Sequence, residues 1–166
     1  MSYETKQTIH PFIHVYRDAP LTDNASNYGE AYDEDGFPYD IVDNSGGGLS
    51  YNFASDSISI NAKGLYLISY SYNVRNNDNN TGGDTIEFGV SINTPPSTTL
   101  VKYYSEVDTE GYSSALRYII SNSIFVSCNA GDMIKGYVGG SGTSHDFVTS
   151  NRGSTSLSIG LIAPYS

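Results

Sequence analysis

Five acidic side chains between residues 33 and 43 form a group of potential metal ligands: Asp33, Glu34, Asp35, Asp40 and Asp43. Carboxylate oxygens are ligands that Ca²⁺ prefers, so a calcium site at Asp33 and Asp35 is one interpretation. The complete calcium-loop pattern, with alternating Asp or Asn and a terminal Glu, is missing. A solvated acidic loop, or one that meets a basic partner, is therefore favoured, and we predict no cofactor.

Other side chains with reactive chemistry occur singly or at unsuitable spacing. Pro11 separates His10 from His14 and favours extended chain, in which four residues span about 13 Å, too far for two ligands of one ion. Residues 111–115 only partly match the Gly-x-Ser-x-Gly nucleophile motif, which also needs a following helix. Cys128 alternates with apolar residues, which is typical of a core position. We expect no metal site at the histidines and no enzyme activity.

The composition predicts one domain with a polar, acidic surface. The chain has 166 residues and a formal charge of -10, but only 16% of its residues are charged. Its polarity comes from 24 Ser, 12 Thr and 14 Asn. Eight scattered basic residues are a poor basis for binding nucleic acid or an anionic membrane, so we expect neither partner. No apolar run approaches the roughly 18 residues of a membrane span, and the first residues do not resemble a signal peptide; we expect synthesis and folding in a cytoplasm.

Alternation of apolar and polar residues predicts strands throughout the chain. The pattern is clear over residues 86–92, 124–128 and 157–161, and a longer apolar run at 65–74 indicates a central strand. Clusters of Gly, Asn and Pro separate these runs and indicate turns. No window keeps a helical period for three turns. About eight or nine strands joined by such loops predict an all-β sandwich or barrel.

The N-terminal residues differ from the rest in composition. Between residues 18 and 43 there are eight acidic residues and no basic residue. We therefore predict an N-terminal arm at 1–30 and a β domain at 31–166. Within the arm, Ile9, Phe12, Ile13 and Val15 form an apolar patch that could dock on another protein.

Three stretches together resemble the jelly rolls of the tumour-necrosis-factor and complement-head superfamily. Residues 60–70 are similar to its turn glycine followed by an aromatic-rich strand. Residues 129–134 resemble its Gly-Asp entry into a later strand, and residues 156–162 resemble its closing strand. The order and spacing agree over roughly residues 36–163.

This resemblance implies an antiparallel jelly-roll β-sandwich that assembles as a compact homotrimer. The fold also occurs in trimeric phage capsid decoration and head-fibre proteins. Tyrosine combines a large apolar ring with a polar tip, so it suits subunit interfaces. We predict that Tyr66, Tyr70, Tyr72 and Tyr118 line the trimer interface, the alternative being ordinary sandwich core.

The resulting functional hypothesis is a non-enzymatic virion protein that decorates and stabilises a phage capsid. Its partners would be its own copies and the major capsid protein or other virion subunits. It would be made in the host cytoplasm and located on the capsid surface. The alternatives are a receptor- or glycan-binding head-fibre domain, with recognition by loops 76–84 and 139–146, and a bacterial surface or spore-coat domain.

Overall fold

The computed structural model describes residues 10–18, 22–25, 37–44, 47–75, 85–93, 100–108, 117–141, 145–148 and 155–165. Within these residues the regular structure consists of strands and turns, with no helix. The described part of the chain accordingly contains no helix with the length and hydropathy of a membrane span.

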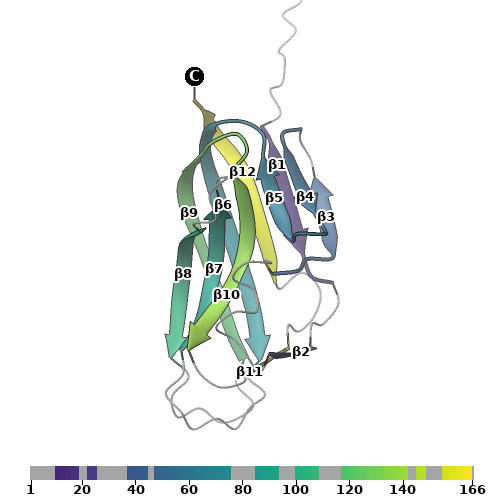
Figure 1. Cartoon of the computed structure of the whole chain (residues 1–166), viewed down its shortest axis with the longest axis vertical. Coiled ribbons are helices and arrows are strands. Elements are labelled where there is room, and N and C mark those ends of the chain that lie inside the picture. Colours follow the sequence, from purple (N-terminus) through teal and green to yellow (C-terminus); the bar gives the residue numbers. More distant parts are fainter. Residues whose placement is uncertain are drawn as a thin grey trace, which may run out of the picture.

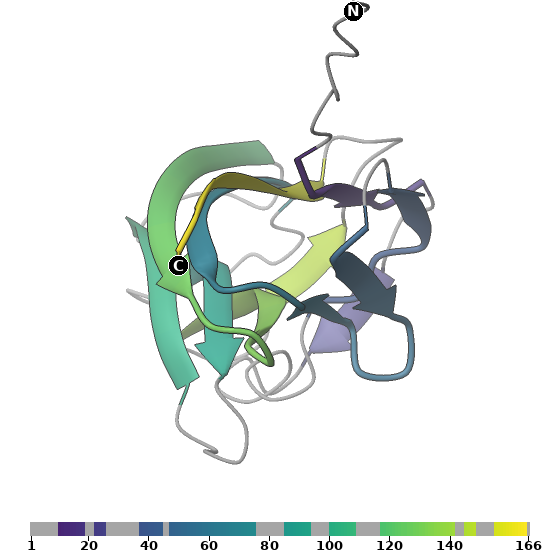
Figure 2. The same ribbon diagram turned by 90° about the horizontal axis from the view of Figure 1, so that it is seen from above.

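Two five-stranded antiparallel sheets form the sandwich (Figures 1 and 2). The first sheet contains, in spatial order, β3 (Ile41–Asn44), β1 (Phe12–Tyr16), β12 (Ser156–Pro164), β6 (Gly64–Arg75) and β9 (Arg117–Cys128). The second contains β4 (Leu49–Asn52), β5 (Ser57–Ile60), β10 (Met133–Ser141), β7 (Thr85–Asn93) and β8 (Leu100–Asp108). A separate pair joins β11 (His145–Val148) to β2 (Thr22–Ala25). The antiparallel sandwich and its crossing connections confirm the predicted jelly roll.

Alternation along the strands builds the core between the sheets. In β7 the side chains of Phe88, Val90 and Ile92 are buried, as their spacing predicts. The same period buries Leu157, Ile159 and Leu161 in β12, and Val126 and Cys128 in β9. Because successive side chains of a strand point to opposite faces, the residues between these positions lie on the outward faces.

The N-terminal boundary differs from the prediction. Residues 12–16 form β1, which is paired with β12 on one side and β3 on the other. Ile13 and Val15 are completely buried in the core, so these two side chains cannot dock on another protein. Their alternate spacing matches a half-buried strand, whose partners lie far away in the sequence. The sandwich therefore begins by residue 12, not at residue 31. Phe12 remains exposed, and Ile9 lies outside the described residues.

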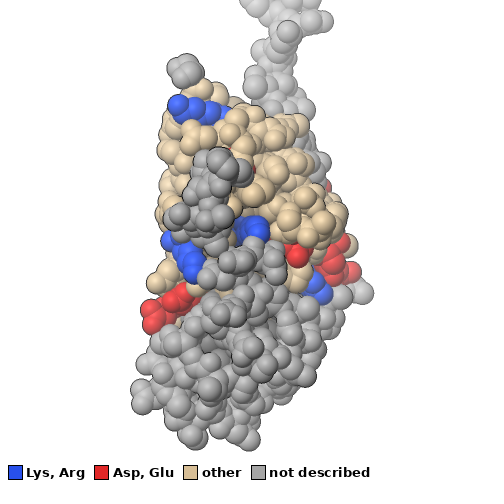
Figure 3. Space-filling view, in the orientation of Figure 1, with Lys and Arg blue, Asp and Glu red and all other residues tan. Residues whose placement is uncertain are grey.

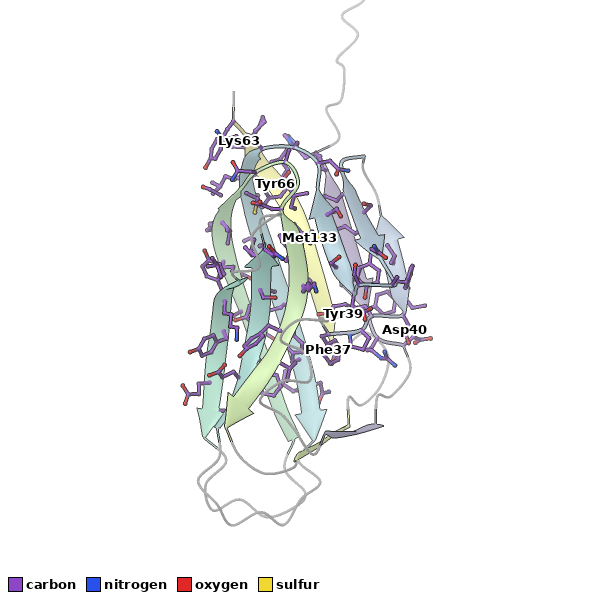
Figure 4. The ribbon with its side chains drawn as sticks, viewed as in Figure 1. Phe37, Tyr39, Asp40, Lys63, Tyr66 and Met133 are labelled. Carbon is purple, nitrogen blue, oxygen red and sulfur yellow. The ribbon has the colours of Figure 1, made fainter. Side chains whose placement is uncertain are left out.

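Aromatic side chains from the segment before β3 pack into the core, and Figure 4 labels two of them, Phe37 and Tyr39. Phe37 and Tyr39 are buried, and the ring of Phe37 makes edge contacts with those of Tyr39 and Tyr72. The Phe37 amide donates to the Gly136 carbonyl at 2.8 Å, and the Tyr72 hydroxyl donates to the Gly89 carbonyl at 2.7 Å. Burial raises the pKa of both tyrosines, Tyr39 and Tyr72, above the ordinary value. The segment before β3 is thus tied to β10 and the core.

Residues 129–132 form the turn that the Gly-Asp motif predicts. Gly131 has a φ of 96°, a conformation that L-residues rarely adopt. The Asn129 amide donates to the Asp132 carboxylate at 2.8 Å, and the Gly131 amide donates to the Ile60 carbonyl at 2.7 Å. The motif therefore sets the start of β10 against the end of β5.

Candidate functional site

The most distinctive surface is the outward face of the first sheet, which points away from the second sheet. Residues opposite each other in neighbouring antiparallel strands share a face, so the register defines rows of side chains across it. Two rows consist of serine over three adjacent strands and are called the serine rows: Ser158–Ser69–Ser123 and Ser156–Ser71–Ser121. The row Phe12–Gly160–Leu67–Phe125 is called the apolar row.

Hydrogen bonds hold the serine rows together. The hydroxyl oxygens of Ser69 and Ser123 are 2.8 Å apart, and the Ser121 hydroxyl donates to Ser71 at 2.9 Å. Each such pair uses one of its two O–H donors for this hydrogen bond. Because serine is small, the rows form a shallow hollow of about 450 Å³, lined by all six serines with Tyr70 and Asn122. This part of the face offers neutral hydroxyl groups.

Large apolar side chains flank the hollow. Phe125 is 66% exposed and Phe12 is 39% exposed, at opposite ends of the apolar row. The Phe12 ring lies beside Gly160, where an added Cβ would meet its Cδ2 at 3.5 Å. Ile162, at the bulge in β12, and Ile119, in β9, are also exposed. An exposed apolar group of this size on one face is characteristic of an interaction surface.

Among the described side chains, the outward face of the first sheet carries almost no formal charge; Arg75 and Arg117 are opposite each other at one end of it, and their side chains lie outside the described residues. Over β1, β12, β6 and β9, the described outward side chains include no Lys, Arg, Asp or Glu. Asp43, in the edge strand β3, is opposite His14 and brings a carboxylate to the margin. A surface without like charges allows two strongly acidic chains to approach each other there.

His14 connects the margin to the serine rows. Its Nδ1 lies 2.7 Å from the Ser158 hydroxyl oxygen, and its ring stacks on Tyr16 with centroids 5.5 Å apart. The side chain is half-buried. Both contacts are made within the first sheet, so His14 acts as a packing residue there, with its Nδ1 in hydrogen-bond contact with Ser158. His10 is exposed.

The outward face of the second sheet carries charges of both signs. Tyr137 donates to Glu87, and the Lys102 ammonium lies 4.6 Å from the centre of the Tyr137 ring. Glu106 is directly opposite Glu87. Charged side chains are also visible in the view of Figure 3, where the described surface at the upper end is mainly uncharged. The serine rows and the apolar row, which contain no charged residue, thus lie on the first sheet and not on the second.

Three of the predicted interface tyrosines lie inside the single chain. Tyr66, Tyr70 and Tyr72 in β6 are at most 2% exposed and point into the core. They are core residues, because their even spacing places them on the inner face of β6, and they have no surface to offer to a second chain. The side chain of Tyr118 lies outside the described residues, although its backbone pairs with Val74.

The structure describes the candidate nucleophile, Cys128, but not the candidate calcium ligands. Asp33 and Asp35 lie outside the described residues. Among the residues that the structure places, no three His, Cys, Asp or Glu side chains gather as metal ligands. Cys128 is buried, and burial, with a smaller contribution from the Asp132 carboxylate, raises the pKa of its thiol to about 11. The thiol is therefore protonated at neutral pH, in agreement with its prediction as a core residue.

Sequence reasoning missed the serine rows. Serine alternates with larger residues at 69 and 71, at 121 and 123, and at 156 and 158. This alternation is visible in the sequence, but each pair is unremarkable in a chain with 24 serines. The rows appear only when β12, β6 and β9 become neighbours in the folded sheet.

No protein-family model and no curated protein matches this sequence. Several solved structures are similar in fold. Eiger TNF from S. frugiperda is 9% identical, with a TM-score of 0.64 and 95% of each chain covered. Murine APRIL at pH 5.0 is 13% identical, with a TM-score of 0.62, and the match covers 93% of this chain and 100% of that one. The globular domain of the zebrafish complement 1qA protein is 11% identical, with a TM-score of 0.59, and the match covers 93% and 99%. The chain therefore has the jelly-roll fold seen in tumour-necrosis-factor and complement-head domains.

Proposed function

We propose that this chain is a non-enzymatic structural protein that assembles as a homotrimer through the outward face of its first sheet. The observation that carries the proposal is the exposure of Phe12, Phe125 and Ile162 on a face whose described side chains over β1, β12, β6 and β9 carry no formal charge. Removing a side chain of this size from water contributes about 1.5–3 kcal/mol. Each chain carries a charge of -10, so copies repel one another elsewhere on their surfaces.

A ring of three identical subunits requires contact between two different surfaces of the subunit. The second surface that fits is the side of the sandwich formed by the edge strands β8 and β9, which follow the same side in Figures 1 and 2. These edge strands carry exposed apolar side chains: Val101 in β8, Tyr104 on the adjoining outward face of the second sheet, and Ile119 where β9 borders the outward face of the first sheet. Edge strands of this length are usually protected, and a neighbouring subunit would cover them.

The trimer's role in the proposal is to decorate and stabilise a phage capsid. The resemblance of residues 60–70, 129–134 and 156–162 to jelly rolls of the kind found in such proteins supports this role. A rigid sandwich with a polar, acidic exterior is suited to an exposed position on a particle. The capsid partner would be the major capsid protein or another virion subunit.

The assembly is tested by light scattering on the purified chain and on two matched variants. The chain of 18.0 kDa should give a mass of about 54 kDa as a trimer. Phe125→Ser should give monomers, because it removes an apolar contact of the outward face. Phe53→Ser is the control: Phe53 is 60% exposed on the turn between β4 and β5, and its loss should leave the trimer intact. A monomeric parent chain, or equal effects of both substitutions, would contradict the proposal.

The capsid role is tested with particles assembled with and without the protein. Decorated particles should withstand higher temperature and lower ionic strength than undecorated ones, and electron cryo-microscopy should show trimers on the shell. Particles that are equally robust but cannot adsorb to cells would favour a receptor-binding head instead. Failure to bind any particle would favour a bacterial surface or spore-coat protein.

A further inference from the structure

We propose that the outward face of the second sheet binds a saccharide that carries a carboxylate. The inference is independent of the trimer proposed above, because that contact uses the first sheet and the edges of β8 and β9. The register of β10, β7 and β8 places three neighbouring rows of different chemistry on this face. They are called the basic row, Lys135–Ser91–Lys102, the aromatic row, Tyr137–Gly89–Tyr104, and the acidic row, Glu87–Glu106.

The basic row offers donors to an anionic group. Ser91 lies between Lys135 and Lys102 in the register and is only 1% exposed, and its hydroxyl has no hydrogen-bond partner among the described residues. A buried hydroxyl without a partner is costly. Lysine stems are long and rotatable, so both ammonium groups can turn to hold a carboxylate to which Ser91 also donates. Two residues along the same face, the Asn93 side-chain oxygen is also buried without a described partner, and it would accept from an adjoining hydroxyl group.

The aromatic row offers a ring on which a sugar can stack. Tyr104 is 46% exposed, and its ring centroid lies 6.0 Å from that of Tyr137. An added Cβ at Gly89 would stand 1.9 Å from the Tyr103 carbonyl oxygen, so no side chain can separate the two rings. The C–H side of a sugar ring is apolar and packs on an exposed aromatic ring. Tyr104 points outward from the second sheet, beyond the strand edge that a neighbouring subunit would cover.

The acidic row offers acceptors to hydroxyl groups. Glu106 is exposed and lies directly opposite Glu87, whose carboxylate accepts from the Tyr137 hydroxyl. Like charges directly opposite each other in a sheet are unfavourable. Sugar hydroxyls that donate to both carboxylates would form charge-assisted hydrogen bonds and relieve this repulsion.

A saccharide with a carboxylate can meet all three rows at once. Successive rows are two residues apart along each strand, so the basic and acidic rows are about 13 Å apart. Two or three linked sugar rings span this distance. An inorganic anion would contact the basic row alone, and a neutral saccharide would leave the two ammonium groups without a charged partner from the ligand.

The experiment is isothermal titration calorimetry of the full chain with trisaccharides of galacturonic acid and of N-acetylneuraminic acid. We expect binding of at least one of them, and binding of the neutral trisaccharide of galactose to be about tenfold weaker, because it lacks the charge-assisted hydrogen bonds at the basic row. Tyr104→Ser and Lys135→Gln should each raise the dissociation constant about tenfold. Tyr165→Ser and Lys63→Gln are the matched controls and should bind like the parent chain, since Tyr165 is 42% exposed after β12 and Lys63 is exposed before β6.

The inference is overturned if neither acidic trisaccharide binds, or if the neutral trisaccharide binds equally well. Displacement by sulfate, together with unchanged binding to the Tyr104→Ser variant, would indicate a site for an anion only. A peptide of alternating Asp and Lys that binds more tightly than both acidic trisaccharides would indicate a protein partner instead. Circular dichroism shows that each variant is folded. Light scattering on the same samples reports the oligomeric state, so failure of this inference and failure of the trimer are distinguished.

Discussion

Gly136 in β10 lies against a cluster of buried aromatic side chains, Phe37, Tyr39 and Tyr72. A Cβ at this position would stand 2.6 Å from the Tyr39 hydroxyl, 2.8 Å from the Tyr72 hydroxyl and 2.9 Å from the Phe37 Cβ. All three side chains are buried, and the hydroxyls of Tyr39 and Tyr72 are 3.4 Å apart. The neighbours cannot withdraw without breaking other contacts, so the glycine is required for close packing and not for its φ.

Gly136→Ala should therefore lower the free energy of unfolding by about 1–3 kcal/mol, the usual cost of inserting a methyl group into a packed core. Gly47→Ala is the control, because a Cβ there meets nothing within 4 Å. Urea denaturation followed by circular dichroism measures both. A Gly136→Ala variant as stable as the Gly47→Ala variant would show that the aromatic cluster is loosely packed.

At the scale of the elements, local alternation predicted the strands and their inner faces well. It identified β6, β7, β9 and β12, and the Gly-Asp motif predicted the turn before β10. It did not reveal that β1 belongs to the sheet, because its partners β12 and β3 are set by long-range pairing. Ile13 and Val15 are apolar both in a docking arm and in a core strand, and only the pairing distinguishes the two. The serine rows escaped prediction for the same reason.

The segment at 37–40 is held to the core by buried phenols, which predicts a loss of stability at high pH. Burial raises the pKa of Tyr39 and Tyr72 above 10, whereas the same groups ionise near 10 in the unfolded chain. Their contribution is fully present below pH 10 and decreases as the pH rises through that value, because only the unfolded chain then releases the protons. At pH 10.5 each phenol should reduce the free energy of unfolding by about 1 kcal/mol relative to pH 8.

Urea denaturation at pH 8 and pH 10.5 measures this decrease. Tyr72→Phe lowers stability at both pH values, since it loses the hydrogen bond to Gly89, but it should show a smaller decrease between them. The informative quantity is how much the free energy of unfolding falls from pH 8 to pH 10.5, compared between the parent chain and the variant. An identical decrease in the parent chain and in the variant would mean that Tyr72 ionises in the folded protein as it does in the unfolded chain.

At the scale of the whole molecule, the described N-terminal residues are part of the first sheet. The described contacts of β1 begin at Pro11, whose carbonyl accepts from the Leu161 amide at 3.0 Å. Removal of residues 1–9 leaves all of these contacts, so the thermal midpoint should stay within a few degrees of that of the full chain. Removal of residues 1–17 deletes β1 and exposes β12 and β3, so the sheet should not form.

Differential scanning calorimetry of the two truncated chains checks this prediction. A cooperative transition in the chain that lacks residues 1–17 would show that β1 is dispensable for the sandwich. Loss of the transition on removal of residues 1–9 alone would show that these residues stabilise it. The shorter truncation is also the suitable variant for testing whether Ile9 and its neighbours attach the protein to a particle, since it leaves Ile13 and Val15 in the core.

The position of β12 has a consequence for synthesis on the ribosome. Among the described strands, β12 is the last in sequence order, yet it lies in the middle of its sheet, between β1, the first of them, and β6. Until residues 156–164 leave the exit tunnel, β1 and β6 have no bond to each other, and each presents an unpaired edge. The first sheet therefore cannot close before residues 156–164 are released from the tunnel, and until then the vacant edges are open to strands of neighbouring nascent chains on the same messenger.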